Sequence, residues 1–220
     1  MSGETQSLRC LVTAGPTREF FDPVRFISNP SSGKMGYALA AEAARLGWAV
    51  DLVSGPVALA DPEGVRVTRV VTGEEMYDAC RPLFAQCHLL IMTAAVCDFR
   101  PKQRFEQKQK KDACPAMIAF EPVRDILKTL AAGKQPWQRV AGFAAETEDL
   151  EIHAQEKLEA KRLDWIVANT VGGPDSAFES DANRVCLMGR DGSRIRIGPA
   201  DKRAVAAALM RYWHDAICPA

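Results

Sequence analysis

The chain has 220 residues, of which 47% are apolar and 25% are charged, a composition typical of a folded globular protein. Its 28 Lys and Arg residues balance 28 Asp and Glu residues, which argues against a nucleic-acid or membrane binder that relies on bulk electrostatics. The longest unbroken apolar run, Ala204–Met210, is far shorter than the ~20 residues that a membrane-spanning helix needs. The seven cysteines form no CxxC pair, and the N-terminus lacks the features of a signal peptide. We therefore expect a reduced, cytoplasmic protein.

Strand-like and helix-like segments alternate along the chain, which predicts a parallel sheet covered by helices on both faces. Expected strands are Leu8–Thr13, Ala49–Ser54, Val65–Val71, His88–Thr93, Val140–Ala144 and Trp165–Ala168. Expected helices are Ser31–Gly47, Glu74–Gln86, Arg124–Ala132 and Leu150–Arg162. The first helix is expected to be capped by Ser31 or Ser32 and to end at Gly47.

The alternation breaks at Phe99–Asp112, which has no apolar periodicity, and it resumes at Met117–Phe120. Alternating residues around an Asp-Gly turn predict an antiparallel hairpin of Arg184–Gly189 and Arg194–Ile197, followed by a last helix at Asp201–Asp215. No linker or internal repeat divides the chain. We predict one doubly wound, Rossmann-like α/β domain over residues 1–220, with a mostly parallel sheet and a small antiparallel C-terminal hairpin.

Sheets of this class bind ligands at the carboxyl ends of their strands, but the usual nucleotide-binding signatures are missing. The dinucleotide fingerprint GxGxxG is absent, and the second strand ends in Ser54 rather than in an acid for the ribose. Around Gly33, the P-loop positions hold Ser28 and Met35 instead of Gly and Ser or Thr. One alternative is an NAD(P)-dependent oxidoreductase, although the chain lacks the typical motifs of that class. A second alternative is a non-catalytic nucleotide-binding protein.

The run Ser31–Gly36, with the sequence SSGKMG, offers a positive signal for ligand binding. It brings small residues and backbone N–H groups to the start of a helix, an arrangement that favours a phosphate or carboxylate. Alternatively, Gly33 and Gly36 only allow close packing of the helix on the sheet. The preceding loop, Thr17–Pro30, is long for a connection between a strand and its helix, and long loops in compact domains tend to be functional. The loop therefore favours the binding interpretation.

The residues from the first strand to this helix resemble bacterial phosphopantothenate–cysteine ligase. The similarity begins with Thr13–Glu19, Asp22–Asn29 and Ser31–Gly36, and continues in order through Val53–Pro56, Ala94–Arg100, Lys108–Lys111, Gly142–Thr147 and Ala168-Asn169. It covers nearly the whole chain. In many bacteria this domain follows a flavin-dependent decarboxylase, whereas the present chain resembles a free-standing ligase, for which no flavin is expected.

The resemblance implies a two-step ligation in coenzyme A biosynthesis. The carboxylate of 4′-phosphopantothenate attacks the α-phosphate of a nucleoside triphosphate, usually CTP in bacteria, to give an acyl-nucleotide and pyrophosphate. The amine of cysteine then attacks the acyl carbon and forms 4′-phosphopantothenoylcysteine. The resemblance further implies Mg²⁺ with CTP or ATP as co-substrate, a homodimer, and small-molecule partners rather than nucleic acid or a membrane.

The resemblance also assigns catalytic and substrate-binding residues. Asn29 matches the family residue that serves the acyl-nucleotide, where its NH₂ can donate to an oxygen that gains negative charge. Arg25 can hold a phosphate or carboxylate as a bidentate fork, together with Ser31, Ser32, Gly33 and Lys34. Without the motif around them, Asn29 would be interpreted as a turn residue before Pro30, and Arg25 as a solvated loop arginine.

Nucleotide contacts are implied for Ala94, Asp98, Lys108, Asp125, Ile126, Phe143, Lys157 and Lys161. Residues 100–111 carry six Lys or Arg and one Glu, a run that is usually a solvated or disordered segment. Because the run directly follows Asp98, we interpret it as a mobile flap whose lysines close on a triphosphate, with Lys108 as the catalytic contact. Lys157 and Lys161 lie four residues apart and share a helix face, where they would otherwise pass as solubilising charges.

The chain departs from the family at the segment before its third expected helix. The family commonly has Lys-Asn-Pro-Asp-Ile there, whereas Pro122–Ile126 keeps only the final Asp and Ile. This departure leaves the choice between CTP and ATP open. We interpret six of the cysteines as small core residues: Cys10, Cys80, Cys87, Cys97, Cys114 and Cys186. No ligand-spaced cluster is found, so no metal ligand from the protein is predicted.

Overall fold

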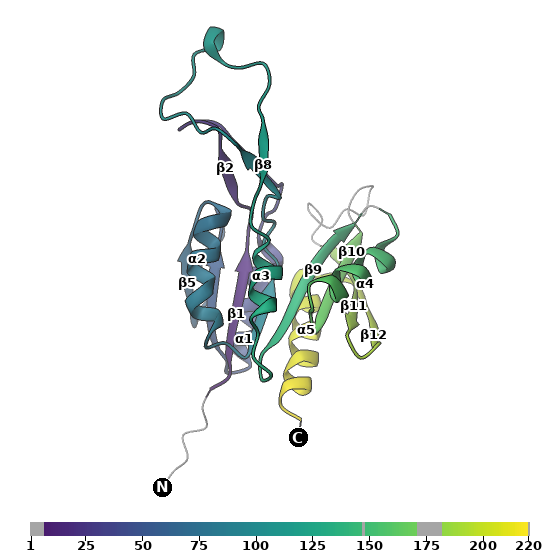
Figure 1. The fold of residues 1–220 in the computed structure, drawn as a ribbon. Coiled ribbons are helices and arrows are strands. Elements are labelled where there is room, and N and C mark those ends of the chain that lie inside the picture. Colours follow the sequence, from purple (N-terminus) through teal and green to yellow (C-terminus); the bar gives the residue numbers. More distant parts are fainter. Residues whose placement is uncertain (1–6, 147, 171–181, 220) are drawn as a thin grey trace.

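The computed structural model describes residues 7–146, 148–170 and 182–219, so Thr147 of the matched run lies outside the described residues. Eight strands form one twisted sheet (Figure 1). In order across the sheet they are β12 (Arg194–Asp201), β11 (Ala182–Gly189), β10 (Trp165–Thr170), β9 (Arg139–Glu146), β6 (Leu89–Met92), β1 (Arg9–Ala14), β4 (Ala49–Ser54) and β5 (Val65–Arg69). The pairings are parallel except at β11 and β12, which form the predicted C-terminal hairpin and add antiparallel strands to the sheet. The predicted fold class is confirmed.

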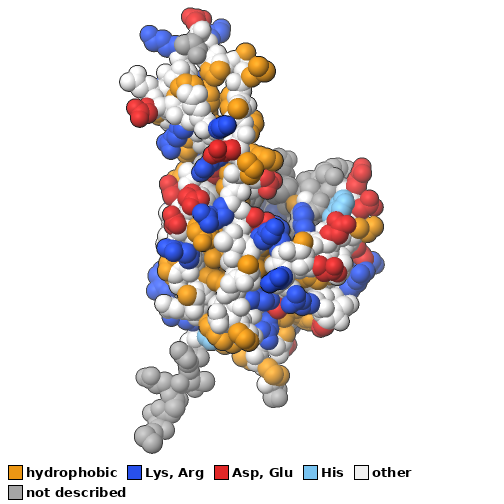
Figure 2. All heavy atoms as spheres, viewed as in Figure 1, with side chains coloured by type: hydrophobic (Ala, Val, Ile, Leu, Met, Phe, Trp, Pro, Cys, Tyr) orange, Lys and Arg blue, Asp and Glu red, His pale blue; other side chains and the backbone are white. Residues whose placement is uncertain are grey.

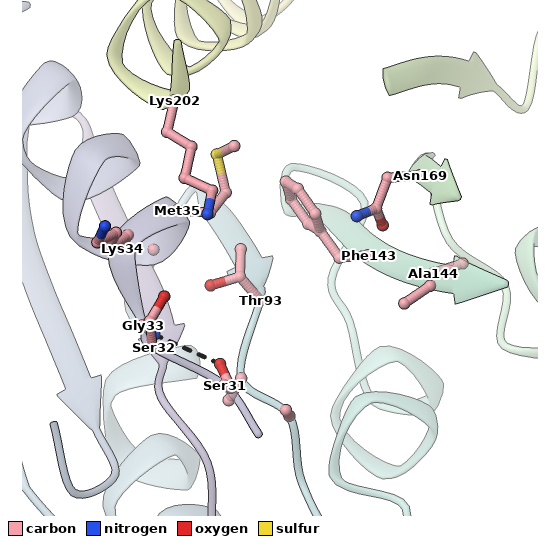
Figure 3. Close-up of a pocket in the computed structure, with 14 residues that line it drawn as sticks. Ser31, Ser32, Gly33, Lys34, Met35, Thr93, Phe143, Ala144, Asn169 and Lys202 are labelled. Carbon is pink, nitrogen blue, oxygen red and sulfur yellow. Dashed lines mark hydrogen bonds between the residues drawn. The ribbon is translucent and has the colours of Figure 1, made fainter. Parts of the chain in front are cut away.

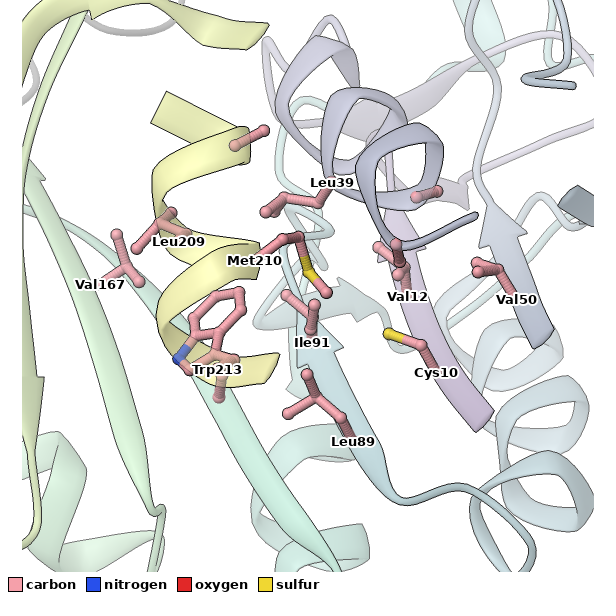
Figure 4. Packing of buried hydrophobic residues seen from close by; sticks show 14 of the residues in the cluster. Cys10, Val12, Leu39, Val50, Leu89, Ile91, Val167, Leu209, Met210 and Trp213 are labelled. Atoms are coloured by element: carbon pink, nitrogen blue, oxygen red, sulfur yellow. The ribbon is translucent and has the colours of Figure 1, made fainter. Parts of the chain in front are cut away.

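Helices cover both faces of this sheet, as predicted. Helices α1 (Lys34–Arg45) and α5 (Lys202–Ile217) pack on one face, and α2 (Gly73–Phe84), α3 (Ile126–Ala132) and α4 (Leu150–Ala160) pack on the other. Figure 4 shows the first of these cores, in which Leu39 of α1 and Trp213 of α5 lie over the strands. Trp213 has no exposed surface, so its burial holds α5 against the sheet. Helix α5 therefore packs beside α1 although the two helices are far apart in the sequence.

The direction of the chain reverses between β1 and β6, and this reversal locates a ligand site. From β1 the chain crosses through α1 to β4, whereas α2 returns it from β5 to β6 on the other side of β1. The loops after β1 and β6 therefore diverge at the carboxyl edge of the sheet and leave a crevice there. Open α/β sheets bind their ligands at such switch points.

Two pairs of short strands form a projection from this edge, which we define as residues 18–28 and 99–122 (Figure 1). Strand β2 (Arg18–Phe20) pairs with β3 (Phe26–Ser28), and β7 (Phe99–Pro101) pairs with β8 (Phe120–Pro122). The rings of Phe21 and Phe105 lie 5.3 Å apart and join the two parts. The segment Phe99–Asp112, for which no regular element was predicted, thus begins with a strand.

The cysteine prediction holds for five of its six residues. Cys10, Cys80, Cys87, Cys97 and Cys186 are buried, and all seven cysteines are free thiols. Burial raises the pKa of Cys80 and of Cys87 to about 12, so both are unreactive thiols at neutral pH. Cys114 was wrongly predicted as a core residue, because it is half-buried in the projection, where it contacts Arg25. None of the helices among the described residues combines the length and the apolar character needed to cross a membrane.

Candidate functional site

A cavity of about 170 Å³ lies at the switch point of the sheet (Figure 3). It is lined by the start of α1, the segment after β6, the ends of β9 and β10, and the first residue of α5. The structure brings six residues of the predicted site to this cavity: Ser31, Ser32, Gly33, Lys34, Ala94 and Phe143. The remaining described lining residues are Met35, Gly36, Thr93, Ala95, Ala144, Ala145, Asn169 and Lys202. No Asp or Glu belongs to this described lining.

The first turn of α1 presents its backbone to the cavity because of Gly33. This residue is the N-cap and has a φ of 73°, a left-handed conformation that favours glycine. The predicted serine cap is wrong: the N-cap is Gly33, which has no side chain to accept a hydrogen bond from the first turn of the helix. Ser31 Oγ instead accepts a hydrogen bond from the Gly33 N–H at 3.4 Å. The first intrahelical bond is donated by Tyr37 to Gly33, so the N–H groups that precede it point out of the N-terminal end of the helix, an arrangement that suits an anion.

Gly36 allows α1 to approach the sheet closely. A Cβ atom at this position would lie 2.6 Å from Ala14 Cβ and 2.5 Å from Thr93 Oγ1. Thr93 cannot simply turn away, because its hydroxyl donates a hydrogen bond to the Thr13 carbonyl. The binding and packing interpretations of the glycines in SSGKMG are therefore compatible, since close packing places the helix start at the switch point.

Asn29 braces the segment that forms one wall of the cavity. Its Nδ2 donates to the carbonyl oxygens of Ala95 and Val96, at 3.1 Å each. The Thr17 N–H also donates to the Ala95 carbonyl, and the Ala95 N–H donates to Gly15. Both amide hydrogens of Asn29 thus bond to protein backbone in this structure, which sequence reasoning could not anticipate. The observed contacts make Asn29 a positioning residue for this wall.

Arg25 and Lys108, both predicted as catalytic, lie together in the projection and not at the cavity of Figure 3. They line a second, basic cavity of about 680 Å³ with Gln109, Lys110, Lys111 and Cys114. The Arg25 guanidinium donates to Asp22 Oδ2, at 2.7 Å from Nη2, and to the Gln109 carbonyl at 2.8 Å. Arg25 therefore ties the two parts of the projection to each other.

The ion pair of Asp22 with Arg25 makes the stability of the projection dependent on pH. Hydrogen bonds from Arg25, Val24 and Gln109 hold the pKa of the fully buried Asp22 carboxyl well below its ordinary value, although burial alone would raise it. A lowered folded-state pKa stabilises the protein above the unfolded pKa of about 3.9, and this stabilisation is lost as the pH falls below that value. We expect Asp22→Asn to lower the free energy of unfolding at pH 7 more than at pH 3. Urea unfolding of both proteins at each pH measures the difference, and an equal loss at both would contradict this account.

A second group of predicted nucleotide contacts meets at the start of α3. Asp125 caps this helix by accepting from the Lys128 N–H at 2.9 Å, and it forms a 2.8 Å ion pair with Lys161, the C-cap of α4. Ile126, by contrast, is 2% exposed and belongs to the core, so only its backbone can meet a ligand. Lys157 lies one turn before Lys161 on α4. The Asp98 carbonyl accepts a hydrogen bond from the Val123 N–H. This bond connects Pro122–Ile126, the segment whose sequence differs from that of the family, to the segment after β6.

Sequence reasoning missed Thr93, Asn169 and Lys202 as individual cavity residues. Asn169 stood at the end of the matched motif, and its place at the carboxyl end of β10 was the signal that could have identified it. Thr93 had the same signal at the end of its strand. Lys202 had no local signal, because only the packing of α5 against α1 brings it to the cavity.

Comparison with known proteins identifies the family of the chain. Residues 5–216 match the family described as the DNA/pantothenate metabolism flavoprotein C-terminal domain. The chain is 44% identical over 209 residues to the coenzyme A biosynthesis bifunctional protein CoaBC of Vibrio cholerae, covering 94% of this chain and 52% of the relative. It is 41% identical over 211 residues to the CoaBC protein of Bacillus subtilis, covering 96% and 52%. The chain thus spans about half the length of these relatives.

Solved structures give the same assignment. The crystal structure of the C-terminal domain of CoaBC superposes with a TM-score of 0.82 at 39% identity and covers 96% of both chains. A Cab2 variant in complex with phosphopantothenate-cysteine has a TM-score of 0.78 at 16% identity, covers 96% of this chain and 87% of its own, and supports the fold alone. These findings confirm the resemblance inferred from the sequence. The chain belongs to the family of the DNA/pantothenate metabolism flavoprotein C-terminal domain.

Proposed function

We propose that this protein ligates 4′-phosphopantothenate to cysteine in coenzyme A biosynthesis, through an acyl-nucleotide and with release of pyrophosphate. The observation that carries the proposal is the cavity at the switch point, where the start of α1, Lys34 and Lys202 meet with no acidic residue in the described lining. Such a site suits an anionic substrate. The similarity to CoaBC proteins across nearly the whole chain supplies the class of reaction.

The proposed chemistry has two steps. The phosphate of the acid substrate binds at Ser31–Lys34, and its carboxylate reaches the α-phosphate of the triphosphate. The wall at Ala94 and Ala95, braced by Asn29, positions the acyl-nucleotide while the amine of cysteine attacks the acyl carbon. The bond to the nucleotide then breaks, and the nucleoside monophosphate leaves. Here the protein supplies mainly orientation and charge.

The triphosphate is expected to lie between the cavity and the start of α3. Phe143 contacts it from the cavity, and Asp125, Lys157 and Lys161 contact it from α3 and α4, while Asp98 lies near the base. Mg²⁺ enters as part of the nucleotide substrate, since Mg²⁺ is usually held by substrate phosphates with few protein ligands. No group of three potential ligands was found among the described residues. The assay of product formation described below compares CTP with ATP and so tests which base the site accepts.

A homodimer is the second part of the proposal. The projection exposes apolar side chains on its surface (Figure 2), namely Val24, Phe26, Ile27, Phe99, Met117, Ile118 and Phe120. Exposed apolar patches of this kind mark protein–protein contacts, and a second copy of the chain is the expected partner. Either movement of the projection or its placement against the second copy has to bring Lys108 to the triphosphate, because Lys108 does not line the cavity.

Product formation tests the proposal. The purified chain is incubated with 4′-phosphopantothenate, cysteine, Mg²⁺ and either CTP or ATP, and pyrophosphate and amide are measured together. We expect both products in equal amounts, with no flavin absorbance in the protein. Absence of both products with every triphosphate would overturn the ligase, whereas reduction of a nicotinamide cofactor by the protein would favour an oxidoreductase.

A further inference from the structure

The projection is joined to the rest of the protein beside the start of α2, at the same end of the sheet (Figure 1). Side chains from three separate segments surround Gly73, the first residue of this helix. A Cβ atom at this position would lie 3.2 Å from Val123 Cγ1, 3.3 Å from Glu19 Oε1 and 3.4 Å from Val96 Cγ1. Glu19 lies in β2, Val96 precedes β7, and Val123 follows β8. The chain therefore passes the start of α2 at both of its entries into the projection and at its last exit.

Glu19 places a buried carboxylate in this junction. The residue is 5% exposed, and its Oε1 accepts a 2.9 Å hydrogen bond from the Gly73 N–H. Acidic residues are almost never buried unless they are paired, and the N-terminus of a helix stabilises a negative charge. Helix α2 already has a complete capping box of its own, formed by Thr72 and Glu75. Glu19 is therefore not needed to start the helix, and its hydrogen bond ties β2 to α2.

The same junction supports the wall of the cavity at Ala95 and Val96. The Val96 carbonyl accepts from Asn29 Nδ2 at 3.1 Å, while the Val96 side chain lies against Gly73. Burial raises the pKa of the neighbouring Cys97 thiol, and the nearby charge of Glu19 raises it further. Glu19 and Asn29 thus hold this segment from two sides, Asn29 through the carbonyl oxygens and Glu19 through the start of α2.

We propose that Glu19 is a positioning residue for ligation, which fixes the projection relative to the cavity wall through its hydrogen bond to Gly73. The projection carries Arg25 and Lys108, whereas the wall belongs to the cavity at the switch point. Loss of the bond leaves a buried N–H group without its acceptor and allows β2 to move away from α2. Substrates then bind to either part but are held less often in the arrangement that reacts. The inference deepens the proposed function and rests on it for the identity of the reaction.

Kinetics of two variants and a control test this role. Glu19→Leu removes the acceptor, whereas Glu19→Gln keeps an oxygen that can accept from Gly73. Thr72→Val is the matched control, because Thr72 Oγ1 accepts the Glu75 N–H at 3.2 Å, a bond within the same end of α2 rather than to the projection. We expect Glu19→Leu to lower kcat ~10- to 100-fold while each KM stays within about threefold, the pattern of misplaced reacting groups. Glu19→Gln should recover most of kcat, and Thr72→Val should keep the original kcat.

Hydrogen exchange without turnover separates this inference from the proposed function. At the junction, the Arg18 N–H donates to the Val71 carbonyl, and the Cys97 N–H donates to Thr17 Oγ1. We expect peptides that contain Arg18 and Cys97 to exchange ~10-fold faster in Glu19→Leu than in Thr72→Val, since exchange reports local opening. Peptides from β1 and β6 serve as the internal reference in both variants.

The outcomes distinguish the two proposals. Faster exchange confined to the junction supports the anchoring role of Glu19 even if no variant forms product, in which case only the ligase proposal fails. Unchanged exchange together with unchanged kcat in Glu19→Leu overturns the inference, as does an equal loss of kcat in Thr72→Val. If Glu19→Leu does not fold, Glu19→Asp replaces it, because its shorter side chain keeps the charge but withdraws the carboxylate from the Gly73 N–H, and the same results are expected.

Discussion

An Asn29→Asp variant is expected to keep its release of pyrophosphate but to form the amide up to ~10²-fold more slowly, the usual cost of displacing a reacting group by about 1 Å. The substitution replaces an amide that donates to Ala95 and Val96 with a carboxylate that repels both carbonyl oxygens. We place the acyl group beside this backbone, so its displacement affects attack on the acyl carbon more than attack on phosphorus. The acyl-nucleotide should therefore accumulate, and rapid quenching of a single turnover followed by mass spectrometry measures it.

Ser28→Ala is the control for this experiment. Ser28 precedes Asn29, and its hydroxyl donates a 2.7 Å hydrogen bond to the Thr17 carbonyl rather than to the carbonyl oxygens that Asn29 holds. We expect both partial reactions to stay near their original rates in this variant. Equal loss of pyrophosphate release and amide formation in Asn29→Asp would contradict the assignment to the second step, and would show that Asn29 acts by holding the whole cavity in place.

Gly36→Ala is expected to destabilise the protein and to impair ligation at the same time. The new methyl group would lie within 2.6 Å of Ala14 Cβ and of Thr93 Oγ1, so α1 has to move away from the sheet. Overpacking of this kind costs about 1–3 kcal/mol of unfolding free energy. For a chain of this length the cost corresponds to a decrease in Tm of roughly 2–12 °C. A displacement of the helix start by about 1 Å lowers kcat/KM by up to ~10²-fold.

Gly133→Ala provides the comparison for Gly36→Ala. A Cβ at Gly133 would have its nearest contact at 3.7 Å, an ordinary van der Waals distance, and the φ of −98° is open to any residue. This variant should unfold within about 0.5 kcal/mol of the original protein. If Gly36→Ala shows the same stability and activity as Gly133→Ala, close approach of α1 to the sheet is not what forms the cavity.

The order of strands and helices could be predicted from the sequence because each element has a local signal. The C-terminal hairpin, for example, is marked by alternating residues around Asp191-Gly192. The cap of α1 was predicted incorrectly, because serine side chains are the common solution and the left-handed Gly33 replaces them here. Strands β2 and β7 are three residues long, too short for a periodic signal, and contacts between distant segments such as Phe21 and Phe105 hold them.

The residues of the candidate site also fall into those that the sequence could predict and those that it could not. Motif residues such as Ser31–Lys34 could be assigned from the sequence because they are contiguous and lie at a helix start. Lys202 could not, because it is more than 160 residues away and reaches the cavity only through the burial of residues such as Trp213 between α5 and the sheet. The partner of Arg25 was also hidden, since pairing with Asp22 depends on the fold of the projection.

Transfer of an oxygen isotope tests the central claim, the acyl-nucleotide route, most directly. The reaction is run with 4′-phosphopantothenate labelled with ¹⁸O in its carboxylate, and the products are analysed by mass spectrometry. If the carboxylate attacks the α-phosphate, one labelled oxygen bridges carbon and phosphorus and leaves with the nucleotide when cysteine attacks. The account predicts one ¹⁸O atom in the nucleoside monophosphate for each amide formed. Label in inorganic phosphate, together with a nucleoside diphosphate, would contradict it.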